Sequence, residues 1–368
     1  ERTVRTHTCA KGPSGEDLKA VPRRYRRTKL GIDRFISKLP GGRHIWHAAR
    51  SLKQGIKRLL LPTMIWEELG FTYVGPVDGH NLAELKAALE RAKAYSDGPV
   101  FIHVATRKGM GYYPAETDAV AFHGVPPNGT KRASAPSYSK VFGETVLRIA
   151  REDRRVVAIT AAMLEGTGLN LMAKELPGRV YDVGICEQHA VTFAAGLAKQ
   201  GYVPVVAIYS TFLQRALDQI VHDVCLQNLP VVFALDRAGI VGDDGKTHQG
   251  AFDLSYLGFI PNMAVAAPRD ENELQHLLYT AVHAGRPMAI RYPRGQGCGV
   301  PMDKELRQLP IGRGEMLRDV DHPDIAIVAL GTTVMPALEA ANRLSQTGIQ
   351  CLVVDARFAK PLDSALIL

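Results

Sequence analysis

Hydrophobic residues occur along the chain in short continuous runs separated by helical patterns. Apolar runs rich in Val and Ile lie at residues 100–104, 156–160, 203–208 and 231–235. Segments with helical periodicity alternate with them at residues 81–94, 138–151 and 188–200. Continuous apolar runs are typical of strands covered by helices on both faces, and the alternation favours a parallel sheet. The pattern predicts an α/β fold with parallel sheets.

Two segments without periodicity interrupt this pattern. Residues 126–136 are rich in proline and polar residues, which is typical of an interdomain linker. A second break near residues 301–314 precedes a strand, a helix and a strand that we expect at 325–330, 334–346 and 351–355. We therefore expect four parts, at residues 1–60, 61–130, 131–305 and 306–368, the last being the start of another α/β domain.

The positive charge of the chain is concentrated at one end. The net charge is +8, but residues 1–60 contain 16 Lys and Arg against 4 Asp and Glu, which leaves 29 against 33 in residues 61–368. A segment of this kind can be a transit peptide, a polyanion-binding arm or a solvated linker, and we interpret it as a linker. No nucleic-acid partner is expected.

Five cysteines show no Cys-x-x-Cys pair, which argues against a metal cage and favours a reduced, cytoplasmic setting. We expect Cys186 to be a small, buried apolar side chain. No apolar run reaches the roughly 18 residues that a membrane span requires, so no membrane association is expected.

Polar residues follow three apolar segments in succession. Glu187 lies between a short strand and a helix of small apolar residues, in the segment 182–195. Tyr209 to Phe212 follow the run at 203–208, and a segment rich in glycine and polar residues, 236–248, follows the run at 231–235. These three strand ends are the candidates for chemistry, and a buried carboxylate at position 187 requires a partner.

Together these segments resemble the pyrimidine-binding half of the thiamine-diphosphate enzymes, and most closely the 1-deoxy-D-xylulose-5-phosphate synthase family. Further motifs appear in the family's order, at Gly75–His80, Lys108–Glu116, Phe122–Val125 and Tyr292–Gly295. The resemblance runs from about Leu61 to the last residue. It implies the end of a first domain, a whole transketolase-like pyrimidine-binding domain and the start of a third domain.

The resemblance implies thiamine diphosphate and Mg²⁺ as cofactors. In this interpretation Glu187 exchanges a proton with the aminopyrimidine ring, Phe212 stacks on that ring and Tyr112 contacts the cofactor. Burial favours the protonated form of Glu187, whereas the N-terminus of the following helix favours the ionised form. The family's diphosphate motif, Gly-Asp-Gly with a metal-binding asparagine, does not occur in residues 1–368. The ligands of the metal and the diphosphate are therefore expected in a missing N-terminal part.

The implied reaction is the decarboxylating condensation of pyruvate with D-glyceraldehyde 3-phosphate, which serves isoprenoid, thiamine and pyridoxal biosynthesis. Arg237 and Arg294 are assigned to the phosphate of the acceptor, because a guanidinium group binds phosphate through a fork of donors. Tyr209 and Arg215 are expected to line the same pocket.

Proton transfer is assigned to residues of two glycine-rich loops. Asp244 and His248 lie in one loop and His123 lies in the other, and each could donate or move protons while carbonyl groups react. Lys108 could belong to the active site or to a solvated loop. His80 is expected to shape the turn that precedes the first helix.

Two alternatives stay open. A transketolase or the β subunit of a 2-oxo-acid dehydrogenase shares the implied fold and the glutamate, although the loop at 244–248 and the turn at 75–80 disfavour it. A non-catalytic assembly module with the same fold is the second alternative. Because half of the cofactor would lack ligands, we expect residues 1–368 alone to make no product, and the family implies a homodimer.

Overall fold

The computed structural model describes residues 64–119, 122, 135–242 and 244–368. These residues belong to two compact units that divide near residue 131, and each unit is described by itself. The expected basic linker at 1–60, residues 126–134 of the expected interdomain linker, and His123 lie outside the described residues.

The smaller unit contains a parallel pair of strands, β1 (Thr72–Asp78) and β2 (Val100–Ala105), connected by helix α4 (Leu82–Lys93). Two short helices, α3 (Met64–Glu68) and α5 (Tyr113–Thr117), precede and follow this motif. Helix α4 begins where the Asn81 side chain accepts a hydrogen bond from the Glu84 amide at 3.2 Å, which is a typical N-cap. The helix and strand predicted in this region are confirmed.

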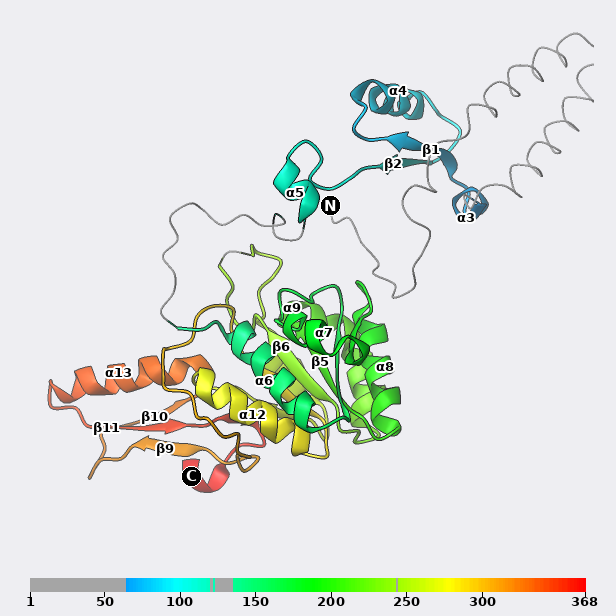
Figure 1. Ribbon diagram of the computed structural model, residues 1–368. Helices are drawn as coiled ribbons and strands as arrows, with labels where there is room; N and C mark the ends of the chain where they lie inside the picture. The colour runs from blue at the N-terminus through cyan, green and yellow to red at the C-terminus, as the bar shows by residue number, and fades with distance from the viewer. Residues whose placement is uncertain (1–63, 120–121, 123–134, 243) are drawn as a thin grey trace, which may run out of the picture. The chain divides into compact units, whose positions relative to one another are not determined.

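A seven-stranded sheet forms the centre of the larger unit, with the order β12-β7-β8-β6-β5-β3-β4. Figure 1 shows two of its strands, β5 and β6, side by side. The six strands from β3 to β8 are parallel, and β12 (Phe358–Lys360) is antiparallel to its neighbour β7. The parallel strands are β3 (Val156–Thr160), β4 (Val180–Asp182), β5 (Val203–Tyr209), β6 (Val232–Asp236), β7 (Ala264–Ala266) and β8 (Met288–Arg291).

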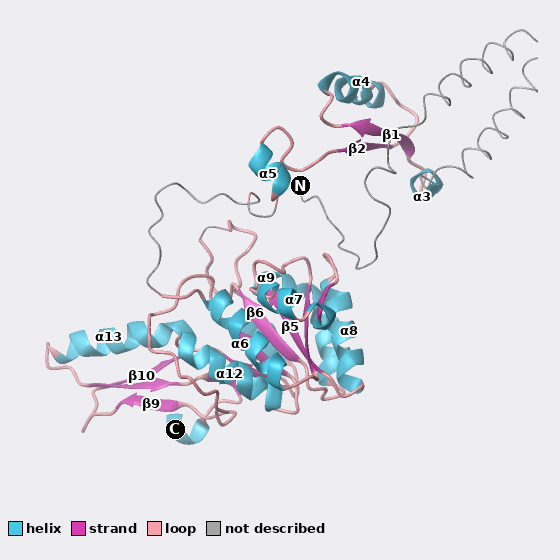
Figure 2. Cartoon of the chain, viewed as in Figure 1, coloured by secondary structure: helices cyan, strands magenta, loops and turns pink. Residues whose placement is uncertain are grey.

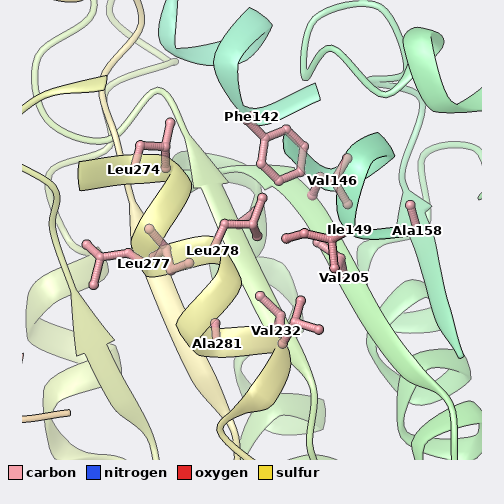
Figure 3. Packing of buried hydrophobic residues seen from close by; sticks show 14 of the residues in the cluster. Phe142, Val146, Ile149, Ala158, Val205, Val232, Leu274, Leu277, Leu278 and Ala281 are labelled. Atoms are coloured by element: carbon pink, nitrogen blue, oxygen red, sulfur yellow. The ribbon is translucent and has the colours of Figure 1, made fainter. Parts of the chain in front are cut away.

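Helices cover this sheet on both faces (Figure 2). On one face lie α6 (Tyr138–Glu152) and α12 (Glu271–His283), and Figure 3 shows Phe142 and Leu278 of these helices close to Val205 and Val232 of the sheet. Helix α8 (Glu187–Lys199) packs its buried alanines on the other face. Burial on both sides explains the continuous apolar runs, and the predicted parallel α/β fold is confirmed.

Shorter elements complete the main body of the larger unit. They are α7 (Asn170–Glu175), η1 (Pro177–Arg179), α9 (Ser210–Leu213), η2 (Gln214–Ala216), α10 (Leu217–Gln219), the π-helical turn η3 (Ile220–Cys225) and α11 (Asp253–Phe259).

A second, three-stranded sheet follows in the chain, with the order β10-β11-β9. Strands β10 (Ile325–Ala329) and β11 (Cys351–Asp355) are parallel and are connected by η4 (Gly331–Thr333) and α13 (Val334–Ser345), so the predicted strand-helix-strand unit is confirmed. Strand β9 (Glu315–Arg318), antiparallel to β11, was not predicted, and neither was β12. The last helix is α14 (Ser364–Ile367).

The break predicted near residues 301–314 contains no helix or strand, but it is tied to α12. The Arg307 amide donates to Nδ1 of His276 at 3.2 Å, and the Leu309 amide donates to Oγ1 of Thr280 at 2.8 Å. The two acceptors are four residues apart and therefore lie on one side of the helix. This segment is a strap with a defined path along α12.

Candidate active site

The carboxyl ends of the parallel strands carry most of the candidate residues. Tyr209 and Asp236 are the last residues of β5 and β6, and Arg294 lies three residues beyond the end of β8. Because these strands are parallel, their carboxyl ends share one edge of the sheet, where α/β proteins bind their ligands.

Glu187 is the first residue of α8, and its side chain is only 2% exposed. The preceding loop is fixed by Asp182 at the end of β4, whose Oδ1 accepts hydrogen bonds from the amides of Ala162 at 2.7 Å and Gly184 at 3.0 Å. The partner that a buried carboxylate requires is Arg215, whose Nη1 lies 3.3 Å from Oε1 of Glu187. The Arg215 side chain is 52% exposed, so the pair links a buried group to the surface.

Aromatic rings connect the Glu187–Arg215 pair to the rest of the site. The Phe212 ring is buried and stacks against Tyr209 with 5.9 Å between ring centroids. The His248 ring meets Phe212 edge-on at 5.3 Å, and Cζ of Arg215 lies 5.3 Å from the centroid of the Phe212 ring. This continuous series of contacts runs from Glu187 through Arg215 and Phe212 to Tyr209, and His248 joins it at Phe212.

Two arginines converge on one carboxylate at the other end of this series. Oδ1 of Asp244 lies 2.7 Å from Nη1 of Arg294, and Oδ2 lies 3.3 Å from Nε of Arg237. Arg237 also donates to the Gly166 carbonyl at 2.9 Å, and its Cζ lies 3.7 Å from the centroid of the Tyr209 ring. Burial raises the pKa of the Tyr209 hydroxyl, and the Arg237 cation opposes that rise.

Asp236 forms an ion pair with Arg237 on the buried side of the site and was not among the predicted site residues. It is fully buried, and its Oδ2 accepts a hydrogen bond from Oγ of Ser139 at 2.6 Å. Its Oδ1 lies 3.0 Å from Nη1 of Arg237, an ion pair without hydrogen-bond geometry. Burial raises the pKa of Asp236, against the influence of Arg237 and Ser139. Arg237 itself has a φ of 61°, an unusual conformation for a residue with a side chain.

Candidates from the smaller unit are placed only within that unit. Tyr112 is exposed, and its ring meets Phe122 edge-on at 5.5 Å. Nε2 of His80 accepts a hydrogen bond from the Arg107 amide at 2.7 Å, and the His80 amide donates to Oδ1 of Asp78 at 2.9 Å. His80 therefore shapes this turn, as predicted. His123 lies outside the described residues.

The prediction that Cys186 is buried is wrong, because its side chain is exposed. The buried stripe of α8 contains Glu187, Ala190, Val191 and Ala194, at the spacing of one helix face. Cys186 precedes this stripe by one residue, in a non-helical conformation, and so it does not share the buried face.

Within residues 64–119, 122, 135–242 and 244–368, no group of three or more His, Cys, Asp or Glu side chains is arranged to hold a metal ion. In the same part of the chain, no helix combines the length and the apolar character needed to cross a bilayer.

Three family models match successive parts of the chain. The 1-deoxy-D-xylulose-5-phosphate synthase model matches residues 18–106, the transketolase pyrimidine-binding domain matches residues 134–298, and the transketolase C-terminal domain matches residues 314–368.

Curated relatives and a solved structure agree with these matches. The 1-deoxy-D-xylulose-5-phosphate synthase of Dehalococcoides mccartyi is 56% identical over 347 residues, covering 94% of this chain and 54% of the relative. Synthase 1 of Geobacter sulfurreducens is 56% identical over 353 residues, covering 94% and 55%. A structure described as a split gene transketolase, an inactive beta4 tetramer, is 32% identical with a TM-score of 0.56, covering 63% of this chain and 75% of that chain.

The strand order of the larger unit, with a buried glutamate at the start of the helix after β4, defines a transketolase-like pyrimidine-binding protein. The chain spans about half the length of the curated relatives it matches. It belongs to the 1-deoxy-D-xylulose-5-phosphate synthase family. The resemblance inferred from the sequence is thereby confirmed.

Proposed function

We propose that the polypeptide encoded by this gene is a 1-deoxy-D-xylulose-5-phosphate synthase, which joins pyruvate to D-glyceraldehyde 3-phosphate with loss of carbon dioxide. The observation that carries this proposal is one series of contacts that places a buried carboxyl group and an aromatic ring next to two converging arginines. The names of the relatives at 56% identity support the same activity.

The residues at the Glu187 end of this series of contacts match thiamine diphosphate in chemical type. Glu187 offers a buried carboxyl group that can hold or release a proton at a ring nitrogen, and Phe212 offers an aromatic face for a flat heterocycle. Arg215 contacts both residues, which supports a place for it at this end of the site. When bound, the cofactor supplies the carbon nucleophile and the electron sink for decarboxylation.

The acceptor phosphate is proposed to bind at Arg237 and Arg294. Both guanidinium groups already converge on a single carboxylate, Asp244, so the two cations favour an anion at this place. The Tyr209 ring packs against the guanidinium group of Arg237 and borders the proposed phosphate site. On the buried side of Arg237, Asp236 forms an ion pair with the guanidinium group and accepts a hydrogen bond from Ser139.

Proton transfer to the reacting carbonyl groups is proposed for Asp244 and His248. The His248 ring lies edge-on to Phe212, and its Nδ1 lies 3.0 Å from Oγ1 of Thr247. An imidazole suits this task because it changes charge near neutral pH. His123 and the cofactor contact of Tyr112 belong to the same proposal through the family resemblance.

Family membership also supports Mg²⁺ as the second cofactor and a cytoplasmic homodimer as the assembly. The related split gene transketolase is described as inactive in its tetramer. By analogy, we expect residues 1–368 alone to make no product.

The test measures product formation by the chain as its gene encodes it, supplied with thiamine diphosphate and Mg²⁺. We expect product from pyruvate and D-glyceraldehyde 3-phosphate. Arg294→Ala should raise the KM for the phosphorylated acceptor about 10- to 100-fold, because a charge-assisted fork to phosphate is lost. The KM for pyruvate and the use of unphosphorylated D-glyceraldehyde should change little.

Arg343→Ala, an exposed arginine in the last turn of α13, is the matched control and should leave both KM values unchanged. Preference for a ketose phosphate donor over pyruvate would identify a transketolase instead. Equal losses of Arg294→Ala with both aldehydes would refute the phosphate assignment.

A further inference from the structure

The loop that carries Asp244 and His248 is closed at its base by a backbone bridge. The Gly239 amide donates to the Gly250 carbonyl and the Gly250 amide donates to the Gly239 carbonyl, each at 2.8 Å. Gly250 leaves no space for a side chain, since a Cβ there would meet the carbonyl oxygen of Arg237. The base of the loop is thus packed against the residue that follows β6.

Gln249 spans the interior of this loop. Its Oε1 accepts a hydrogen bond from the Val241 amide at 2.6 Å, and its Nε2 donates to the carbonyls of Val241 at 2.9 Å and Gly245 at 3.1 Å. A carboxamide offers the same donor and acceptor as a peptide group, so Gln249 pairs with Val241 as a neighbouring strand would. Because Val241 is buried, its backbone groups need such partners within the protein.

These contacts flank the two candidate catalytic residues. Gly245 follows Asp244 directly, and His248 precedes Gln249 directly. The His248 amide also donates to the Gly245 carbonyl at 3.1 Å, so this carbonyl accepts from both His248 and Gln249. The backbone on either side of the segment 244–248 is therefore held by one side chain.

We propose that Gln249 is a positioning residue that fixes Asp244 and His248 relative to Arg237 and Phe212, an inference that rests on the proposed function for its catalytic meaning. The ion pairs of Asp244 and the edge-on contact of His248 both depend on where this segment lies. Gln249 itself acts through the backbone of the loop.

Two variants separate the contributions of the acceptor oxygen and the donor NH₂ group of Gln249. Gln249→Met keeps the length of the side chain and removes both the acceptor and the donor. Gln249→Glu keeps the acceptor, but an ionised carboxylate faces the carbonyl oxygens of Val241 and Gly245 and repels them. When that carboxyl is protonated, it can donate to one of these carbonyls again, so its effect depends on pH.

The first measurement is amide hydrogen exchange in the chain as its gene encodes it, which needs no catalytic activity. In Gln249→Met the Val241 amide should exchange about tenfold faster or more, because its acceptor is gone, while the amides of β6 stay unchanged. Gln346→Met, at an exposed glutamine that ends α13, is the control. Unchanged exchange at Val241 would overturn the proposal.

The second measurement is kcat/KM against pH. Gln249→Met should lower kcat/KM about tenfold or more at every pH. For Gln249→Glu, the ratio of the variant's kcat/KM to that of the wild type should rise as the pH falls from about 8 towards 5. The reason is that the introduced carboxyl group at position 249 protonates in this direction. A pH-independent ratio would show that the residue only supports the fold. A wild-type protein that forms no product would reject the proposed function, and hydrogen exchange would then still decide whether Gln249 braces the loop.

Discussion

At the scale of single residues, the site joins the buried carboxyl group of Glu187 to the exposed guanidinium group of Arg215. Glu187 is identifiable from the sequence, because it stands between a short strand and an apolar helix within a family motif. Its pairing with Arg215 is not, since the two residues are 28 positions apart and meet only when η2 packs beside α8. The role of Asp236 escaped prediction for the same reason, since its partner Ser139 lies 97 positions away. Gln249 also escaped prediction, because nothing in the sequence shows that its carboxamide folds back onto the backbone of Val241 and Gly245 in its own loop.

Glu187→Gln should lower turnover by about 10²- to 10⁴-fold in the chain as its gene encodes it, because an amide cannot exchange a proton with the cofactor ring. The melting temperature should change little, since the amide keeps the shape of the side chain. A product assay and a thermal melt test both statements. Glu175→Gln, at an exposed glutamate on α7, should leave turnover unchanged. Turnover within about threefold of the wild type would remove Glu187 from the mechanism.

At the scale of elements, prediction succeeded where a segment carries its own pattern. The continuous apolar runs of β3, β5, β6 and β11 and the periodicity of α6 and α13 are local, and each element was found within a residue or two. Strands β9 and β12 have four and three residues, and each depends on a distant partner, β11 or β7. Their own residues contain too little pattern to reveal them.

Helix α12 begins with a buried carboxylate that organises the loop after Arg294. Glu271 accepts three backbone hydrogen bonds, with Oε1 bound to the amides of Gly299 at 2.7 Å and Val300 at 3.1 Å, and Oε2 bound to the amide of Cys298 at 2.8 Å. An amide has only one acceptor oxygen, so a glutamine here would place its NH₂ group against a backbone N–H.

Glu271→Gln should therefore lower the free energy of unfolding by about 1.5–3 kcal/mol, the range for lost hydrogen bonds to a charged group. Urea denaturation measures this change. Glu305→Gln, at an exposed position on the neighbouring strap, should change stability by less than about 0.5 kcal/mol. Equal effects of the two substitutions would contradict the role given to Glu271.

At the scale of the larger unit, a network of charges ties the two sheets together. Arg357 donates to Oε1 of Glu273 on α12 at 2.7 Å and to Oε2 of Glu315 on β9 at 2.5 Å. Arg269 donates to the same Glu315 oxygen at 2.8 Å. No local pattern predicts such a network, because its members come from three separate segments of the chain, around residues 269–273, 315 and 357.

This network makes stability depend on pH. Burial alone would raise the pKa of Glu315, but the hydrogen bonds and charges of Arg269 and Arg357 outweigh it and lower the pKa below the ordinary 4.5. The folded state therefore binds this proton less readily than the unfolded state. The stabilisation is present above the ordinary pKa and is lost as the pH falls through the folded value.

Glu315→Gln should lower the free energy of unfolding by roughly 1 kcal/mol at pH 7, a modest value because the side chain is 45% exposed. The difference from the wild type should shrink as the pH falls below about 4. Denaturation at a series of pH values measures it, with Glu339→Gln on the exposed side of α13 as the control. A difference that grows in acid would contradict this account.

The pairing of β12 with β7 has a practical consequence. Phe358 and Lys360 lie opposite Ala266 and Val265 and cover the outer margin of the central sheet. The match to the pyrimidine-binding domain ends at residue 298, so a protein shortened to that limit would expose the unpaired amides of a wholly apolar strand. Such a margin recruits further copies and promotes insoluble aggregates. The shortest piece suited to crystallisation should therefore keep the chain through Lys360.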